Sequence, residues 1–163
     1  TLLSMFQKLA ERANDDKLHL KWQSPITNFP VVQAYLKPIT KRTELKYGDD
    51  ILKVNIQVWE EAVINESKQR TGAAPNIVHS LDAVHLTSVV HDSNYLVTVV
   101  HDSFGCHAGN MEDMFMLVRE KFVELYEAQP LENILTQLNS KDLILEKGTL
   151  DVRQVLYSDF AFA

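Results

Sequence analysis

The sequence predicts an α+β fold. Its 163 residues match the length of one ordinary domain. Segments with apolar residues at helical spacing alternate irregularly with short runs rich in β-branched residues. The order that results is helix, irregular and strand segments, helix, strand, turn, helix and helix. This order differs from the regular strand–helix alternation of a parallel α/β sheet.

The composition indicates an ordinary globular chain. Hydrophobic residues make up 45% and charged residues 23%. The net charge of −6 argues against a protein that holds nucleic acid by a basic surface of its own. The single cysteine, Cys106, allows no disulfide within the chain and favours a reducing compartment. No apolar run reaches the length of a membrane span, and no signal-peptide pattern is visible.

The first half of the chain is predicted to hold one helix and two strands. Apolar residues at helical spacing predict a helix over residues 1–14, and alternation predicts a short strand over 16–22. Because the chain begins inside this helix pattern without a methionine, we expect a fragment or a processed product. Three prolines between residues 23 and 38 predict extended or turn structure. Alternating β-branched residues predict a strand over 51–64, although its last residues also suit a helix.

The second half is predicted to be mainly helical. A helix is expected from Pro75 or Asn76, since proline suits a first helical turn. It should bury one stripe, formed by Ile77, Leu81, Val84 and Ser88. His79 and Asp82 would lie away from that stripe. Further helices are expected over 110–129, from Pro130 onward and over about 151–156, with a strand over 95–100.

The pentapeptide Val-Val-His-Asp-Ser occurs twice, at 89–93 and at 99–103. The first copy ends the predicted helix and is followed by Asn94, so it is typical of a helix exit and turn. The second copy follows an apolar strand, which would hold Asp102 on a rigid element, as a metal ligand requires. Gly105 would allow the tight reversal of a β-hairpin. From the residues alone, a functional and a turn-forming role of Asp102 both stay open.

Four blocks of the sequence resemble one enzyme family. "VHDSFG", residues 100–105, resembles the third palm motif of the single-subunit DNA-directed RNA polymerases of phages and organelles. "APNIVHSLDAVHL", residues 74–86, is similar to the helix before that motif, and "DFAFA", residues 159–163, to the family's C-terminus. "PITNFPVVQAYLKP", residues 25–38, is similar to the preceding segment. The sequence differs from the family pattern at residues 81, 83 and 84 and in "CHAG", residues 106–109. These differences leave open whether the chain is of the phage or the organelle type.

The resemblance implies the C-terminal part of a polymerase palm, in which a β-hairpin carrying the catalytic aspartate packs against long helices. It implies a single partial domain over residues 1–163, without fingers, thumb or first palm motif. The reaction would be template-directed nucleotidyl transfer, with two Mg²⁺ ions stabilising the attacking and leaving oxygens. Asp102 would be a metal ligand, and the second aspartate would come from outside this chain. The chain alone is therefore expected to be inactive.

The resemblance also assigns roles to other residues. His101 would contribute at the primer end, or would be a hydrogen-bonded structural histidine. His79 would face the minor groove of the RNA–DNA hybrid, with weaker assignments for Ser80 and Asp82, although His79 also suits an ordinary surface position. Phe162 and Ala163 would fold toward the active centre, or would dock only for stability.

The implied partners are template DNA, RNA transcript, nucleoside triphosphates and the rest of the polymerase, with no membrane. The place of action would be cytoplasmic, in an infected host cell for a phage enzyme, or the mitochondrial matrix for an organelle enzyme. One alternative is a non-catalytic interaction module that assembles with a separate polymerase part. Another is a metal-dependent His-Asp phosphohydrolase, with His101, Asp102 and His107 as zinc ligands. Related DNA polymerases share the palm but lack "DFAFA". A Cys106 nucleophile lacks a third orienting group.

Overall fold

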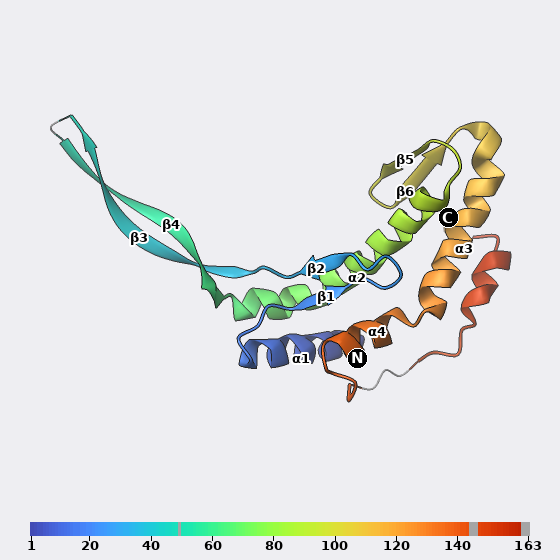
Figure 1. The fold of residues 1–163 in the computed structure, drawn as a ribbon, viewed down its shortest axis with the longest axis horizontal. Helices are drawn as coiled ribbons and strands as arrows, with labels where there is room; N and C mark the ends of the chain where they lie inside the picture. The colour runs from blue at the N-terminus through green and yellow to red at the C-terminus, as the bar shows by residue number, and fades with distance from the viewer. Residues whose placement is uncertain (49, 144–146, 161–163) are drawn as a thin grey trace. The chain divides into compact units, whose positions relative to one another are not determined.

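The computed structural model describes residues 1–48, 50–143 and 147–160. In these residues it confirms the α+β class, because α-helices are combined with small two-stranded sheets (Figure 1). The chain forms two compact units, which consist mainly of Leu3–Leu20 with Val32–Ala73, and of Lys21–Val31 with Ala74 onward. The sequence analysis expected a single partial domain over residues 1–163. The division into two units does not test this expectation, which stays a prediction. Among the described helices, none combines the length and the apolar character needed to cross a membrane.

The first unit contains helix α1 (Leu2–Asp15), which begins at a capping box formed by Thr1 and Ser4. The buried face of α1 matches the predicted spacing and consists of Met5, Phe6, Leu9 and Ala10. The strand predicted over 16–22 is wrong for most of its length, because strand β1 (Lys21–Gln23) begins only at Lys21. The chain turns before it, at Lys17, where φ is +55°. A left-handed residue at this point ends the helix and is incompatible with a strand.

A long antiparallel ribbon of two strands dominates the same unit (Figure 1). Strand β4 (Asp50–Ile64) confirms the predicted strand. It pairs with β3 (Leu36–Tyr47), to most of which the sequence analysis assigned no structure. A register shift separates the Leu36 and Pro38 pairs, as expected where proline cannot donate to the ladder. Most side chains of β3 are exposed on both faces. The strand therefore lacks the apolar alternation by which a half-buried strand is recognised.

Helix α2 (Glu66–Asp92) starts well before the predicted Pro75, and this correction has a local cause. The side chain of Asn65 accepts a hydrogen bond from the backbone N–H of Lys68 at 3.1 Å, which is the geometry of a helix N-cap. One turn later, the fully buried Gln69 fixes the start of the helix. Its amide donates to Asn14 Oδ1 at 2.8 Å and to the Leu18 carbonyl at 3.0 Å. Pro75 therefore lies inside the helix, where its missing N–H removes one backbone bond.

The second unit contains the later part of α2 and most of the remaining elements. These are strands β5 (Val97–Val100) and β6 (Ser103–Cys106), the 3₁₀ helices η1 (Ala108–Asn110) and η2 (Val152–Tyr157), and helices α3 (Met111–Glu127) and α4 (Pro130–Gln137). Strand β1 is joined to β2 (Pro30–Val32) in a separate two-stranded sheet. The helices α3 and α4 confirm the predicted ranges, with Pro130 at the first turn of α4.

The core of the second unit confirms most of the predicted stripe of α2. Ile77, Leu81 and Val84 are at most 4% exposed. Helices α3 and α4 add further buried side chains, which are Met114, Val123, Leu125, Ile134 and Leu135. One face of α2 is thus buried in the core, and the opposite face is exposed and carries polar side chains.

Candidate functional site

The second Val-Val-His-Asp-Ser copy forms a β-hairpin whose two-residue turn is His101 and Asp102. The strands pair from Val97 with Cys106 to Val100 with Ser103, so the turn lies between the last pair. His101 has a φ of +56°, an uncommon value for a residue other than glycine. Asp102 is exposed, as a side chain at the apex of a hairpin should be.

The turn corrects the predicted place of Gly105. This glycine lies within β6 opposite Thr98, not at the reversal. A Cβ atom added to it would lie only 2.7 Å from Thr98 Oγ1, so a larger residue here would have to displace the side chain of Thr98. Strand β5 ends at Val100, where the turn begins.

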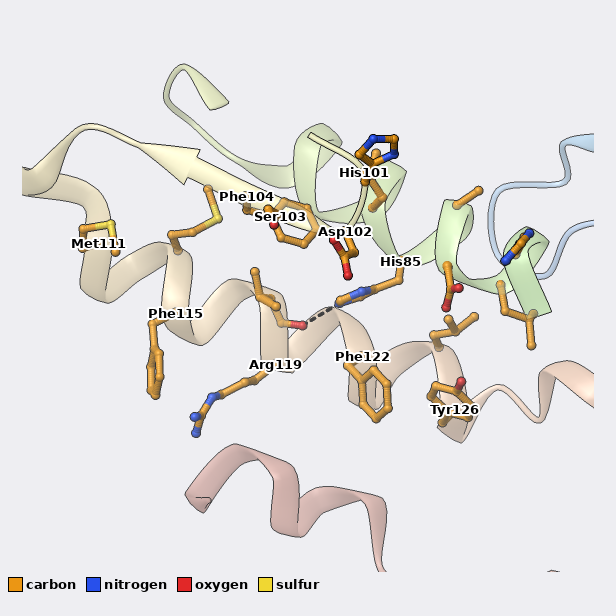
Figure 2. A pocket seen from close by; sticks show the side chains of 18 of the residues that line it. His85, His101, Asp102, Ser103, Phe104, Met111, Phe115, Arg119, Phe122 and Tyr126 are labelled. Atoms are coloured by element: carbon orange, nitrogen blue, oxygen red, sulfur yellow. Dashed lines mark hydrogen bonds between the residues drawn. The ribbon is translucent and has the colours of Figure 1, made fainter. Parts of the chain in front are cut away.

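Asp102 lines an open groove of about 1080 Å³ within the second unit. Parts of α2, the hairpin, α3 and Asp159 form its walls. Figure 2 shows the Asp102 carboxylate directed into the space between the hairpin and α3, whereas the His101 ring is directed the other way. Within the described ranges the carboxylate makes no hydrogen bond or ion pair, so its oxygens are available to a ligand.

His85 ties the walls of the groove together, and the sequence analysis did not single it out. Its Nε2 donates a hydrogen bond to the Val118 carbonyl on α3 at 2.8 Å (Figure 2). Its ring also meets Phe104 of the hairpin and Phe122 of α3 edge-on, at centroid distances of 6.0 and 5.8 Å. The one available signal was its spacing, because His85 follows the buried Leu81 by one helical turn.

Among the described residues, five are predicted to act on the metal or the nucleic acid, and four of these line the groove. They are His79, Asp82, His101 and Asp102. His79 and Asp82 are exposed on α2, away from its buried stripe, as predicted. Burial raises the pKa of Tyr126 on the facing helix α3, and the negative charge of Asp82 raises it further.

Ser80, the fifth residue, is placed differently. It is 8% exposed, and its hydroxyl donates to the Ile77 carbonyl at 2.7 Å. The same oxygen accepts the indole N–H of the buried Trp22 at 3.2 Å. The hydroxyl is therefore satisfied inside the chain, and its predicted contact with nucleic acid stays a prediction.

The first Val-Val-His-Asp-Ser copy ends α2, as predicted for a helix exit. Asp92 accepts a hydrogen bond from His91 Nδ1 at 2.6 Å and forms an ion pair with Lys121 of α3. Lys121 also contacts Glu124 at 2.8 Å. The hydrogen bond from Lys121, and then that from His91, lowers the pKa of Asp92. This aspartate thus joins two helices, whereas Asp102 faces an open groove.

Comparison with known proteins identifies the family. Residues 3–143 match the family model described as DNA-dependent RNA polymerase. The chain is 36% identical over 156 residues to DNA-directed RNA polymerase 1A of Nicotiana tabacum, covering 88% of this chain and 94% of that sequence. The chain belongs to the single-subunit DNA-dependent RNA polymerase family.

The family members it matches come from phages and from organelles. The chain is 36% identical over 158 residues to T7 RNA polymerase of Escherichia phage T7, covering 87% of this chain and 18% of that enzyme. It is also 36% identical to the mitochondrial polymerase 1 of Nicotiana sylvestris, of which it spans 15%. The resemblance read from the sequence is thereby confirmed, and the chain spans less than a fifth of these two polymerases.

The structure also places the remaining candidates of this polymerase segment. Among the described residues, no three His, Cys, Asp or Glu side chains gather into a group that could hold a metal ion. His107 Nδ1 accepts the Gly109 N–H at 3.3 Å, and Cys106 Sγ lies 3.6 Å from the sulfur of Met111. The zinc set His101, Asp102 and His107 is therefore not assembled here. Phe162 and Ala163 lie outside the described residues.

The ion pair of Asp92 predicts a pH-dependent contribution to stability. Because the folded pKa of Asp92 lies below its usual 3.8, its stabilising effect is present above that pH and is lost as the pH falls through the folded value. We expect Asp92→Asn to lower the free energy of unfolding at neutral pH and to have a shrinking effect below about pH 4. Urea titrations at pH 7, 5 and 3.5 measure this, and an equal loss at all three would contradict it.

Proposed function

We propose that Asp102 is a ligand of catalytic Mg²⁺ in template-directed RNA synthesis by the complete polymerase. The observation that carries this proposal is a carboxylate without an internal partner, held at the apex of a short hairpin and directed into a groove. Carboxylate oxygens are the hard ligands that Mg²⁺ prefers. When bound, the two ions would stabilise the attacking and leaving oxygens during transfer of the α-phosphoryl group.

The rigidity of the hairpin supports this role. A ligand must be held within a fraction of an ångström of its productive position by packed neighbours. Phe104 follows Asp102 by two residues and packs against His85, which is itself hydrogen-bonded to α3. The carboxylate is thus supported from two helices. We expect this arrangement to belong to a polymerase palm, in which a segment outside these residues would supply the second carboxylate.

The residues around Asp102 would handle the nucleic acid. His101 would lie at the primer end, and its left-handed backbone is the kind of local strain found at functional sites. His79, exposed on the groove side of α2, would donate to acceptors in the minor groove of the RNA–DNA hybrid, which look similar for all correct pairs. Asp82 would orient neighbouring groups. Phe162 and Ala163 would approach the same centre.

A separate observation favours DNA contact by the β3–β4 ribbon. A two-stranded ribbon has the dimensions to enter the major groove of DNA. Strand β3 carries one acidic residue, Glu44, and four basic ones, which are Lys37, Lys41, Arg42 and Lys46. Its side chains are mostly exposed on both faces, so the basic groups can reach phosphates. We therefore assign template contact to this ribbon despite the acidic balance of the chain.

The relatives indicate two kinds of place in which the enzyme would act. They are polymerases of phages, mitochondria and chloroplasts. The enzyme would act in the cytoplasm of an infected cell if it is phage-encoded, or in the organelle, such as the mitochondrial matrix, if it is not. The alternative function is a non-catalytic module that assembles with a separate polymerase part.

In the complete polymerase, Asp102→Asn should abolish nucleotide incorporation and leave template binding nearly intact, because a neutral amide is a poor metal ligand. Asp92→Asn, the same change in the other copy of the pentapeptide, should retain incorporation. Primer extension and template binding, measured below the melting temperature of both variants, check this. Retained incorporation in Asp102→Asn would refute the metal role.

The purified 163-residue chain should synthesise no RNA, because one of the two carboxylates is supplied from elsewhere. Adding the upstream polymerase segment in trans should restore synthesis. Template-directed synthesis by the chain alone would overturn the two-carboxylate proposal. Failure of the upstream segment to restore synthesis, while the covalently complete enzyme is active, would favour the non-catalytic module.

Arg42→Ala and Lys46→Ala in the ribbon should each weaken promoter-DNA binding by the complete polymerase. Each lost phosphate contact should reduce the slope of log K against log salt by about one. Lys8→Ala removes an exposed lysine from α1 and is the control, for which we expect no change of slope. Binding isotherms at several salt concentrations measure this. Unchanged slopes for both ribbon variants would contradict a DNA contact there.

A further inference from the structure

Arg119 is a buried cation on α3 that the proposed reaction does not use. It is 3% exposed, and its guanidinium carbon lies 3.7 Å from the centre of the Phe115 ring. Its Nη1 donates to the carbonyl of Val155 at 3.3 Å and to that of Ser158. Among the described residues it pairs with no carboxylate. Burying a charged guanidinium costs free energy unless its N–H groups are hydrogen-bonded. The carbonyls of Val155 and Ser158 offset part of this cost.

The two acceptors lie at the end of the 3₁₀ helix η2, which packs along α3. Carbonyls in the last turn of a helix have no partner within the helix. The planar, rigid guanidinium supplies donors in a fixed geometry, whereas an ammonium group would be a single movable charge. By holding one carbonyl inside η2 and one just after it, Arg119 fixes both the place of η2 and the direction in which the chain leaves it.

The chain that leaves η2 reaches the groove of Asp102. Asp159 directly follows Ser158 and lines that groove. Arg119 is itself among the residues that line the groove. Figure 2 shows its side chain directed from α3 toward η2, away from the side on which Asp102 lies. Because its guanidinium is hydrogen-bonded to the carbonyls of Val155 and Ser158, we expect its effect on the reacting groups to pass through the segment that it holds.

We propose that Arg119 is a positioning residue of the polymerase, which directs Asp159 to the catalytic groove. This inference rests on the proposed function of Asp102. Misplacing a group by about 1 Å can reduce a rate about 100-fold. We therefore expect Arg119→Gln to slow nucleotide addition about 10-fold to 100-fold, without changing template affinity.

Arg153 provides a matched control, because it joins the same two elements by another contact. Its Nε lies 2.5 Å from Glu127 Oε1 of α3, with side chains 69% and 45% exposed. Exposed ion pairs of this kind contribute little to stability. Arg153→Gln removes one arginine and one contact between α3 and η2, and it leaves both carbonyl bonds of Arg119 in place.

The experiment uses the complete polymerase and two measurements. Hydrogen exchange over residues 151–160 should become faster in Arg119→Gln and stay unchanged in Arg153→Gln. Single-nucleotide addition should slow only in Arg119→Gln. Unchanged hydrogen exchange in Arg119→Gln, or the same loss of rate in Arg119→Gln and Arg153→Gln, would overturn the proposal.

Asp102→Asn in the same assay reports separately on the proposed function. If that variant stays active, the metal role is refuted whatever Arg119 does. If it is inactive while Arg119→Gln adds nucleotides at the normal rate, only the positioning role is refuted.

Discussion

The hydrogen bond from His85 to the Val118 carbonyl is the interaction on which the groove beside Asp102 depends. It joins α2 to α3 at 2.8 Å, and the same ring supports Phe104 of the hairpin. Because a backbone carbonyl only accepts, Nε2 must carry the proton. Loss of this donor would remove a hydrogen bond between α2 and α3 and would free the hairpin from its support. The position of Asp102 is thus set by a histidine that belongs to neither of the repeated pentapeptides.

The two pentapeptides show how far identical residues can differ in role. In the first, α2 continues to Asp92, whose carboxylate is used in joining α2 to Lys121 of α3. In the second, the strand ends at Val100, and a left-handed His101 turns the chain so that Asp102 faces the groove. What precedes each copy decides between these results, because a helix and a strand present their last residues in different directions.

Much of the fold could be predicted from apolar spacing, and the failures have physical causes. The stripe of α2 and the two later helices each bury one face, so their periodicity is visible in the sequence. The hairpin strand is predictable from its β-branched residues. Strand β3 buries neither face fully and therefore leaves no such pattern. The start of α2 was missed because Pro75 resembles a first-turn proline, whereas the cap at Asn65 depends on one side-chain bond.

The candidate site was predictable in part for similar reasons. The place of Asp102 at the hairpin apex follows from an apolar strand followed by polar residues. The support from His85 depends on a contact with α3, more than 30 residues later, which no local pattern reveals. Ser80 looks like a surface residue between His79 and Leu81, yet its hydroxyl is satisfied by Trp22, 58 positions away. Hydrogen bonds between polar groups far apart in the chain cannot be predicted from the local pattern of a single sequence.

The two-stranded ribbon has a consequence for handling the protein. Each of its strands is an edge strand, with a row of backbone N–H and C=O groups that the partner strand does not use. Pro38 and the charged side chains of β3 protect one edge against pairing with another chain. Strand β4 offers Ile51, Leu52, Val54 and Ile56, all at least 37% exposed, with little such protection. This edge is therefore prone to self-association and aggregation.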